Sequence, residues 1–178
     1  YRKAISYNPS HVKARINLGE TLRKTGKAKE AISHFRTVIK QSSDNFIAHY
    51  NLGLALFTEG KNDEAISHYK IAINLKPNYA IAYNNLGNAL DVIGKTKEAI
   101  SYFKKAIELD PELDIAHYNL GNSFLNTGMT SDAITQYLIA ISLKSNNSAA
   151  YTNLGTALLK ENKTEEAISH YRTAIKIK

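Results

Sequence analysis

The sequence has no cysteine, no tryptophan and only three prolines among its 178 residues. The absence of cysteine excludes a disulfide framework and a thiolate metal site, and it favours an intracellular, cytoplasmic protein. No hydrophobic run approaches the roughly 18 residues of a membrane-spanning helix, so no membrane insertion is expected. The chain also lacks a glycine-rich phosphate loop, a Ser-His-Asp arrangement and a histidine pair at the i, i+4 spacing of a helical zinc site. We therefore expect no enzyme, metal or small-molecule cofactor. No nucleic-acid partner is expected either, because aromatic and basic residues do not alternate along one face.

What the sequence does contain is a repeat of 34 residues. Two glycine series and one alanine series run in the same register: Gly19, Gly53, Gly87, Gly121 and Gly155; Gly26, Gly60, Gly94 and Gly128, with Asn162 in the fifth slot; and Ala31, Ala65, Ala99, Ala133 and Ala167. A fixed period of this length predicts a stack of one structural unit. The predicted repeats are 12–45, 46–79, 80–113, 114–147 and 148–178, and residues 1–11 match the second half of a preceding repeat. We expect residues 1–178 to form one array, and a piece of a longer one.

Each repeat reads as a helix, a tight turn and a second helix, with helices of about 13–14 residues. In the second repeat, Gly60 has the place of a left-handed helix end. Asn62 follows as the expected N-cap of the second helix, with Thr96, Thr130 and Thr164 as its counterparts. The mid-helix Gly53 is expected to face Ala65 where the two helices approach most closely.

The pattern of the third repeat resembles the tetratricopeptide repeat. It has Tyr83, Leu86 and Gly87 in its first half, then Ala99, Phe103, Ala106 and Pro111. The resemblance covers nearly the whole chain. It implies an all-α fold, a right-handed α-solenoid or superhelix of antiparallel helix pairs, whose first helices line a concave groove.

Asparagine precedes the Leu-Gly pair in every repeat, at Asn17, Asn51, Asn85, Asn119 and Asn153. Asparagine is a poor helix former, and the neighbouring leucine and glycine already supply the packing. We therefore expect the column to leave the packed face and to bind an extended peptide backbone, because an amide both donates and accepts hydrogen bonds. The alternatives are a ladder of hydrogen bonds between repeats, or a residue that was duplicated with the repeat and has no function. The column resembles those of O-linked N-acetylglucosamine transferase and kinesin light chains, where the asparagines hold an extended peptide.

Two further groups of residues complete the predicted groove. Amide and aromatic side chains are expected beside the column, at Tyr50, Asn84, Asn88, Tyr118 and Asn122. Residues 12–45 hold eight lysines and arginines against three acidic residues, a net charge of +5. This excess is either a solvated basic face at one end of the chain or a contact for an acidic partner. For the second case we expect Lys13, Arg23 and Lys24 to contact an acidic part of the ligand.

The six histidines are not expected to bind metal. His34, His68 and His170 share one repeat position, and we expect them on the solvated outer surface. His49 and His117 share an aromatic packing position and are expected to be partly buried.

The sequence thus predicts a protein–protein interaction module that binds an extended peptide or a partner protein in its groove. Two alternatives stay open: the substrate-binding arm of a larger enzyme such as a glycosyltransferase, and a structural scaffold in a large assembly. An apolar stripe on the last helix, formed by Ile168, Tyr171, Ala174 and Ile175, also predicts self-association through the C-terminal end.

Overall fold

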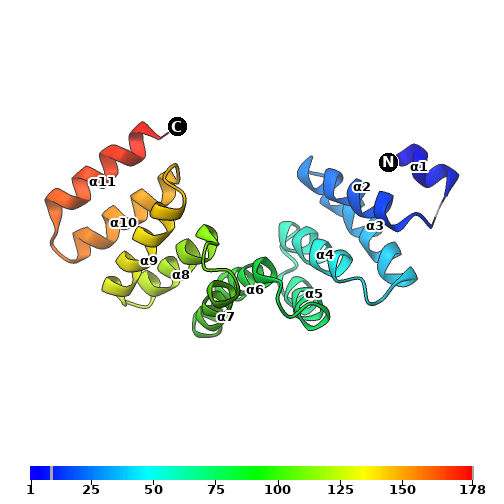
Figure 1. The fold of residues 1–178 in the computed structure, drawn as a ribbon, viewed down its shortest axis with the longest axis horizontal. Helices are drawn as coiled ribbons and strands as arrows, with labels where there is room; N and C mark the ends of the chain where they lie inside the picture. Colours follow the sequence, from blue (N-terminus) through cyan, green and yellow to red (C-terminus); the bar gives the residue numbers. More distant parts are fainter. Residues whose placement is uncertain (9, 178) are drawn as a thin grey trace. The chain divides into compact units, whose positions relative to one another are not determined.

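The computed structural model describes residues 1–8 and 10–177, and all regular structure in this part of the chain is α-helical (Figure 1). This confirms the predicted all-helical solenoid of helix pairs. The chain divides into two compact units, Tyr1–Ile93 and Gly94–Lys178, each described separately below. A single uninterrupted array therefore stays a prediction. Within the described residues, every helix is too short or too polar to cross a membrane.

The helices lie in the parts of each repeat where the sequence predicts them, although the second helices begin one residue early. The first unit holds α1 (Arg2–Tyr7), α2 (Val12–Lys24), α3 (Ala28–Gln41), α4 (Phe46–Thr58), α5 (Asn62–Leu75) and α6 (Ala80–Val92). The second unit holds α7 (Thr96–Leu109), α8 (Asp114–Asn126), α9 (Thr130–Leu143), α10 (Ser148–Lys160) and α11 (Thr164–Lys176). Apart from α1, each helix has 13 or 14 residues. The even-numbered helices, from α2 to α10, are thus the first helices of their repeats.

The tight turn between the two helices of a repeat is built on a left-handed residue. Gly60 has a φ of 74°, and the amides of Gly60 and Lys61 donate to the carbonyls of Phe57 and Leu56 at 3.0 and 2.9 Å. This pair of bonds is the Schellman motif, which satisfies carbonyls at the end of a helix. Asn162 takes the same conformation with a φ of 60°, so the predicted left-handed series is confirmed.

The predicted N-caps of the second helices are wrong by one residue. Asn62 is the first residue of α5, and Lys61 before it has the N-cap position without a side-chain cap. The same holds for the threonines at the start of the later second helices, Thr96, Thr130 and Thr164. The left-handed residue is followed by only one linking residue, so the helix begins earlier than the composition suggests. Side-chain caps lie instead on first helices, where Asn45 accepts from the amide of Ala48 at 2.9 Å.

The two helices of a pair are closest where a glycine lies against an aromatic ring. A Cβ atom added to Gly53 would lie 2.6 Å from Cε1 of Tyr69, and Tyr69 is only 1% exposed. The ring of Tyr69 thus lies nearest to Gly53. The expected contact with Ala65, which is fully buried, stays a prediction. Three other pairs have the same arrangement: Gly19 with Phe35, Gly121 with Tyr137 and Gly155 with Tyr171. The glycine series thus leaves room for rings of the second helices.

Candidate functional site

The asparagine column lies on first helices that contact one another. In the first unit α2 contacts α4 and α4 contacts α6, and in the second unit α8 contacts α10. Asn51 is 7% exposed, and the other four members of the column are half-buried. The column therefore borders the packed interior instead of projecting from it.

Two members of the column are hydrogen-bonded to a tyrosine of the preceding repeat. Nδ2 of Asn85 on α6 donates to the hydroxyl of Tyr50 on α4 at 3.0 Å. Nδ2 of Asn153 on α10 donates to the hydroxyl of Tyr118 on α8 at 3.2 Å. Tyrosine and asparagine are 35 residues apart in both pairs. At these two positions the column makes the inter-repeat bond that the sequence left open as an alternative.

Asn51 shows what happens when the preceding repeat offers no tyrosine. The residue 35 positions before it is Ile16, an apolar residue. Nδ2 of Asn51 donates instead to the carbonyl of Ile47, one turn back on its own helix, at 3.0 Å. The residue in the preceding repeat therefore accounts for the partner of each of these asparagines.

Further predicted groove residues join these tyrosine–asparagine pairs. In the first unit the buried Asn84 donates to Oδ1 of Asn85 at 3.2 Å. In the second unit Oδ1 of Asn122 accepts from Nδ2 of Asn153 at 2.8 Å and from the hydroxyl of Tyr137 at 2.8 Å. These bonds hold the side chains in one orientation. Asn88 is half-buried on α6.

Two tyrosines of these networks, Tyr50 and Tyr137, remain protonated at neutral pH. Burial, with a smaller contribution from the neighbouring Tyr79, raises the pKa of Tyr50 to about 12, although the bond from Asn85 lowers it. Burial also raises the pKa of Tyr137. Because the oxygen of Tyr50 accepts from Asn85, its own proton is left for another acceptor. Nδ2 of Asn153 already donates to both Tyr118 and Asn122, but Asn85 has a second N–H and both amide oxygens have further lone pairs, so the pairs keep hydrogen-bonding capacity.

The three basic residues of the predicted acidic-ligand contact differ in their surroundings. Lys13 and Lys24 are exposed, and Lys24 pairs with Glu20 at 2.7 Å. Arg23 is half-buried. All three residues lie on α2, but only the side chain of Arg23 is partly buried.

One predicted surface histidine lies in an internal contact. Nδ1 of His68 is 3.0 Å from Nδ1 of His49, whose Nε2 is 3.1 Å from the carbonyl of Ser43. His68 is half-buried, as are His34 and His170, so the prediction of solvated rings was wrong for all three, whereas His49 and His117 are buried as expected. Burial lowers the pKa of His68, and the neighbouring His49 lowers it further.

The fourth repeat offers a natural comparison for this pair. There Nδ1 of His117 is hydrogen-bonded to Oε1 of Gln136 at 2.8 Å, so glutamine replaces the second histidine. Within the described residues, no three His, Cys, Asp or Glu side chains are grouped so as to hold a metal ion.

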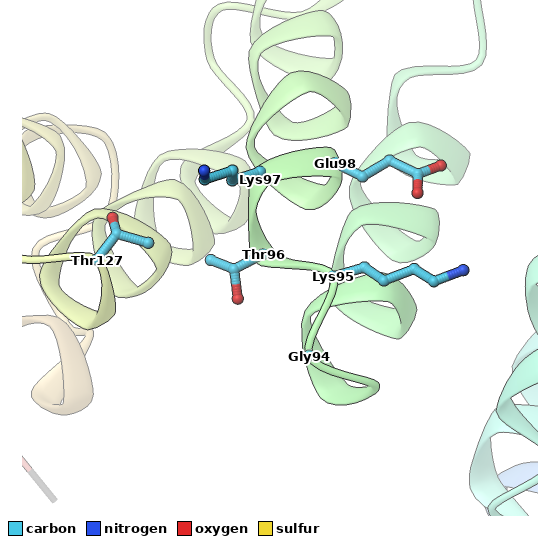
Figure 2. Close-up of a pocket in the computed structure, with 6 residues that line it drawn as sticks. All are labelled: Gly94, Lys95, Thr96, Lys97, Glu98 and Thr127. Atoms are coloured by element: carbon cyan, nitrogen blue, oxygen red, sulfur yellow. The ribbon is translucent and has the colours of Figure 1, made fainter.

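A surface hollow lies at the start of α7, outside the asparagine column. It is lined by Gly94, Lys95, Thr96, Lys97, Glu98 and Thr127. Figure 2 shows Thr127 across from Thr96, while the side chains of Lys95 and Glu98 extend away from it. Because its charged groups do not converge, this hollow does not have the form of a binding site.

The apolar stripe of the last helix is exposed as the sequence predicts. Ile175 is 75% exposed and Ile168 is 36% exposed. Tyr171 and Ala174 are half-buried and line a hollow of about 500 Å³ together with Ile175 and residues of α10. Self-association through this surface stays a prediction.

Family profiles match almost the entire chain. Profiles described as tetratricopeptide repeat match residues 44–112, residues 148–178, and residues 1–33 with 102–135. A profile described as TPR repeat matches residues 19–60. A comparison with curated proteins found no match.

Several solved structures share the fold. MamA is 28% identical, with 89% of this chain and 92% of that chain covered and a TM-score of 0.80. YrrB, a TPR protein with an unusual peptide-binding site, is 22% identical, with 99% and 91% covered and a TM-score of 0.75. The pilF protein of Pseudomonas aeruginosa is 22% identical, with 94% and 76% covered and a TM-score of 0.88.

Proposed function

We propose that the chain, which belongs to the tetratricopeptide repeat family, binds an extended segment of a partner protein along its first helices. Members of this family are generally non-catalytic protein–protein interaction modules. The asparagine column and the tyrosines paired with it bind the backbone of that segment. The observation that carries this proposal is the recurrence of one half-buried tyrosine–asparagine pair, Tyr50 with Asn85 and Tyr118 with Asn153.

The pairs have the properties that backbone recognition requires. Each combines a fixed amide with a tyrosine hydroxyl whose proton is available, so each can both donate and accept. An extended strand presents alternating N–H and C=O groups whatever its side chains are. The ordering cost of the protein side is low, because the bonds between repeats already hold the amides in place.

The spacing of the helices also suits an extended segment. Packed helices lie about 8–10 Å apart, and an extended chain advances about 3.3 Å per residue. One repeat therefore matches about three residues of the ligand. The peptide-binding site of YrrB supports the proposal by analogy, since that protein has the same fold.

The proposal is tested with peptides selected from a displayed random library by the full chain. The affinity of a selected peptide is then measured for the double variant Asn85→Ala with Asn153→Ala. Loss of two peptide hydrogen bonds of about 0.5–1.5 kcal/mol each should weaken binding about five- to 150-fold. Asn126→Ala is the matched control, because Asn126 is an exposed asparagine of α8 outside the column.

A second variant separates binding from stability. Tyr50→Phe with Tyr118→Phe removes the same two inter-repeat bonds but keeps both amides. It should lower the melting temperature at least as much as the asparagine variant, because alanine is a better helix former than asparagine, and it should retain more of the peptide affinity. If the asparagine variant binds the peptide as tightly as Asn126→Ala does, the column only stabilises the contacts between repeats and the proposal is wrong.

A further inference from the structure

A buried donor at the end of α2 has no acceptor. Among the described residues, Nε of Arg23 is the buried side-chain nitrogen or oxygen that lacks a hydrogen-bond partner. Leaving such a donor unpaired is unfavourable, and more so when it belongs to a charged group. Packing does not require arginine here, because the same slot holds Phe57, Asp91, Leu125 and Leu159 in the other repeats. The arginine therefore needs an explanation outside the fold.

The groups around Arg23 are donors as well. Arg23 lies near enough to Tyr50 and Tyr69 to lower the pKa of both hydroxyls, against a larger increase from burial. Both hydroxyls therefore stay neutral and protonated, and neither can neutralise the guanidinium. The oxygen of Tyr50 already accepts from Asn85 at 3.0 Å. Neither tyrosine therefore supplies the negative charge with which a guanidinium pairs most strongly.

The acidic residue on the same stretch of α2 is paired elsewhere. Glu20 lies one turn before Lys24 and is bonded to it at 2.7 Å. Glu20 is close enough to raise the pKa of Tyr50 and of Tyr79, but its ion pair is with the exposed lysine. The negative charge that Arg23 needs must therefore come from outside the chain.

We propose that Arg23 binds a carboxylate of the partner segment, with the hydroxyl of Tyr50 as a further donor. This inference rests on the proposed function and adds the ligand chemistry of one end of the surface. A guanidinium presents Nε and one Nη to the two oxygens of a carboxylate in a planar fork. The carboxylate belongs to an Asp or Glu side chain of an extended segment or to a free C-terminus.

The test begins with two displayed libraries of short random peptides, one with blocked and one with free C-termini. The full chain should enrich peptides with Asp or Glu at one fixed position, or with a terminal carboxylate in the second library. Arg23→Leu, which places in this slot the residue that the fourth and fifth repeats have, should remove that preference. The variant should melt no earlier than the parent, because it removes a buried unpaired donor.

The selected acidic peptide is then compared with its Glu→Gln counterpart, or with its C-terminal amide. For the parent chain the exchange should weaken binding about ten- to a hundredfold, since a charge-assisted bond is lost. For Arg23→Leu the exchange should change affinity less than about twofold. Arg23→Lys keeps the charge without the fork and should fall between them. Lys24→Ala, at the neighbouring exposed cation, should leave the ratio of the two affinities as it is in the parent.

The outcomes separate the two proposals. If the parent enriches no peptide from either library, the proposed function fails and the role of Arg23 fails with it. If peptides are enriched without an acidic group, the proposed function stands and Arg23 is not its carboxylate contact. A Glu/Gln difference that persists in Arg23→Leu likewise overturns the inference.

Discussion

The bond between Tyr50 and Asn85 can be measured by a double-mutant cycle. The variants are Tyr50→Phe, Asn85→Ala and the two combined. Phenylalanine keeps the ring and removes only the hydroxyl that accepts from Nδ2 at 3.0 Å. Each single variant loses this bond, which is worth about 0.5–1.5 kcal/mol net. Both residues are half-buried, so water can replace part of the bond, and we expect a loss near the lower end of that range.

The coupling energy is more informative than either single effect. Asn85→Ala also gains helix propensity of up to about 0.7 kcal/mol, which offsets much of the lost bond. The cycle cancels this gain because it appears in both arms. We expect a coupling of about 0.5–1 kcal/mol between Tyr50 and Asn85. Distant sites add within about 0.3–0.5 kcal/mol, so a real coupling must exceed that limit.

The chain provides its own controls for the cycle. Tyr118→Phe with Asn153→Ala should give a similar coupling, because the same bond recurs there at 3.2 Å. Tyr50→Phe with Asn153→Ala pairs residues of different units and should give none. The free energies of unfolding come from urea melts, and the slope m should stay constant because no new surface is exposed. Equal couplings in the bonded and the crossed cycles would refute the inter-repeat bond.

Gly53→Ala should destabilise by about 1–3 kcal/mol through the clash with Tyr69, and exchanging Tyr69 for leucine should relieve part of that loss in urea melts. The lowered pKa of His68 means that the unfolded chain binds its proton more tightly, so stability should be greatest above the ordinary histidine pKa of about 6.5 and fall as the pH drops below it. His68→Gln, which reproduces the pair of the fourth repeat, should flatten that decline in thermal melts across pH while keeping a bond to His49; an unchanged slope would contradict this. Ile175→Ser should reduce concentration-dependent association in sedimentation if the C-terminal stripe holds two copies together, and a parent chain that stays monomeric at high concentration would refute that contact.

The period of the sequence predicts most of the fold, because equivalent positions pack in the same way in every repeat. Gly60 and Asn162 mark the turn directly, since few other residues accept a positive φ. The start of the second helix was misplaced because Asn62 is a good cap by composition, while the single linking residue Lys61 decides where the helix begins. The period shows which positions are equivalent, but it does not show which atoms touch.

The candidate site shows the same limit more clearly. The column of five asparagines is visible in the sequence, yet the bonds of its members differ with the residue one repeat earlier. Asn85 donates to Tyr50 of the preceding repeat. Asn51 has Ile16 at that place and donates to a carbonyl of its own helix instead. The spacing of 35 residues between tyrosine and asparagine could have revealed this pairing. The unpaired Nε of Arg23 could not be foreseen, since it depends on how far one side chain is buried.

The pairing of each asparagine with the repeat before it also bears on how such a gene can grow or shrink. Loss of the segment 46–79 would bring Asn85 directly after the repeat that contains Ile16, the setting in which Asn51 is found today. Duplication of the same segment would set a new asparagine behind a tyrosine and create another bond across the new junction. In either case each amide has a partner within reach, on the neighbouring repeat or on its own helix. Unequal recombination can therefore change the length of the array, and with it the length of segment it can hold, without a second mutation to repair the junction.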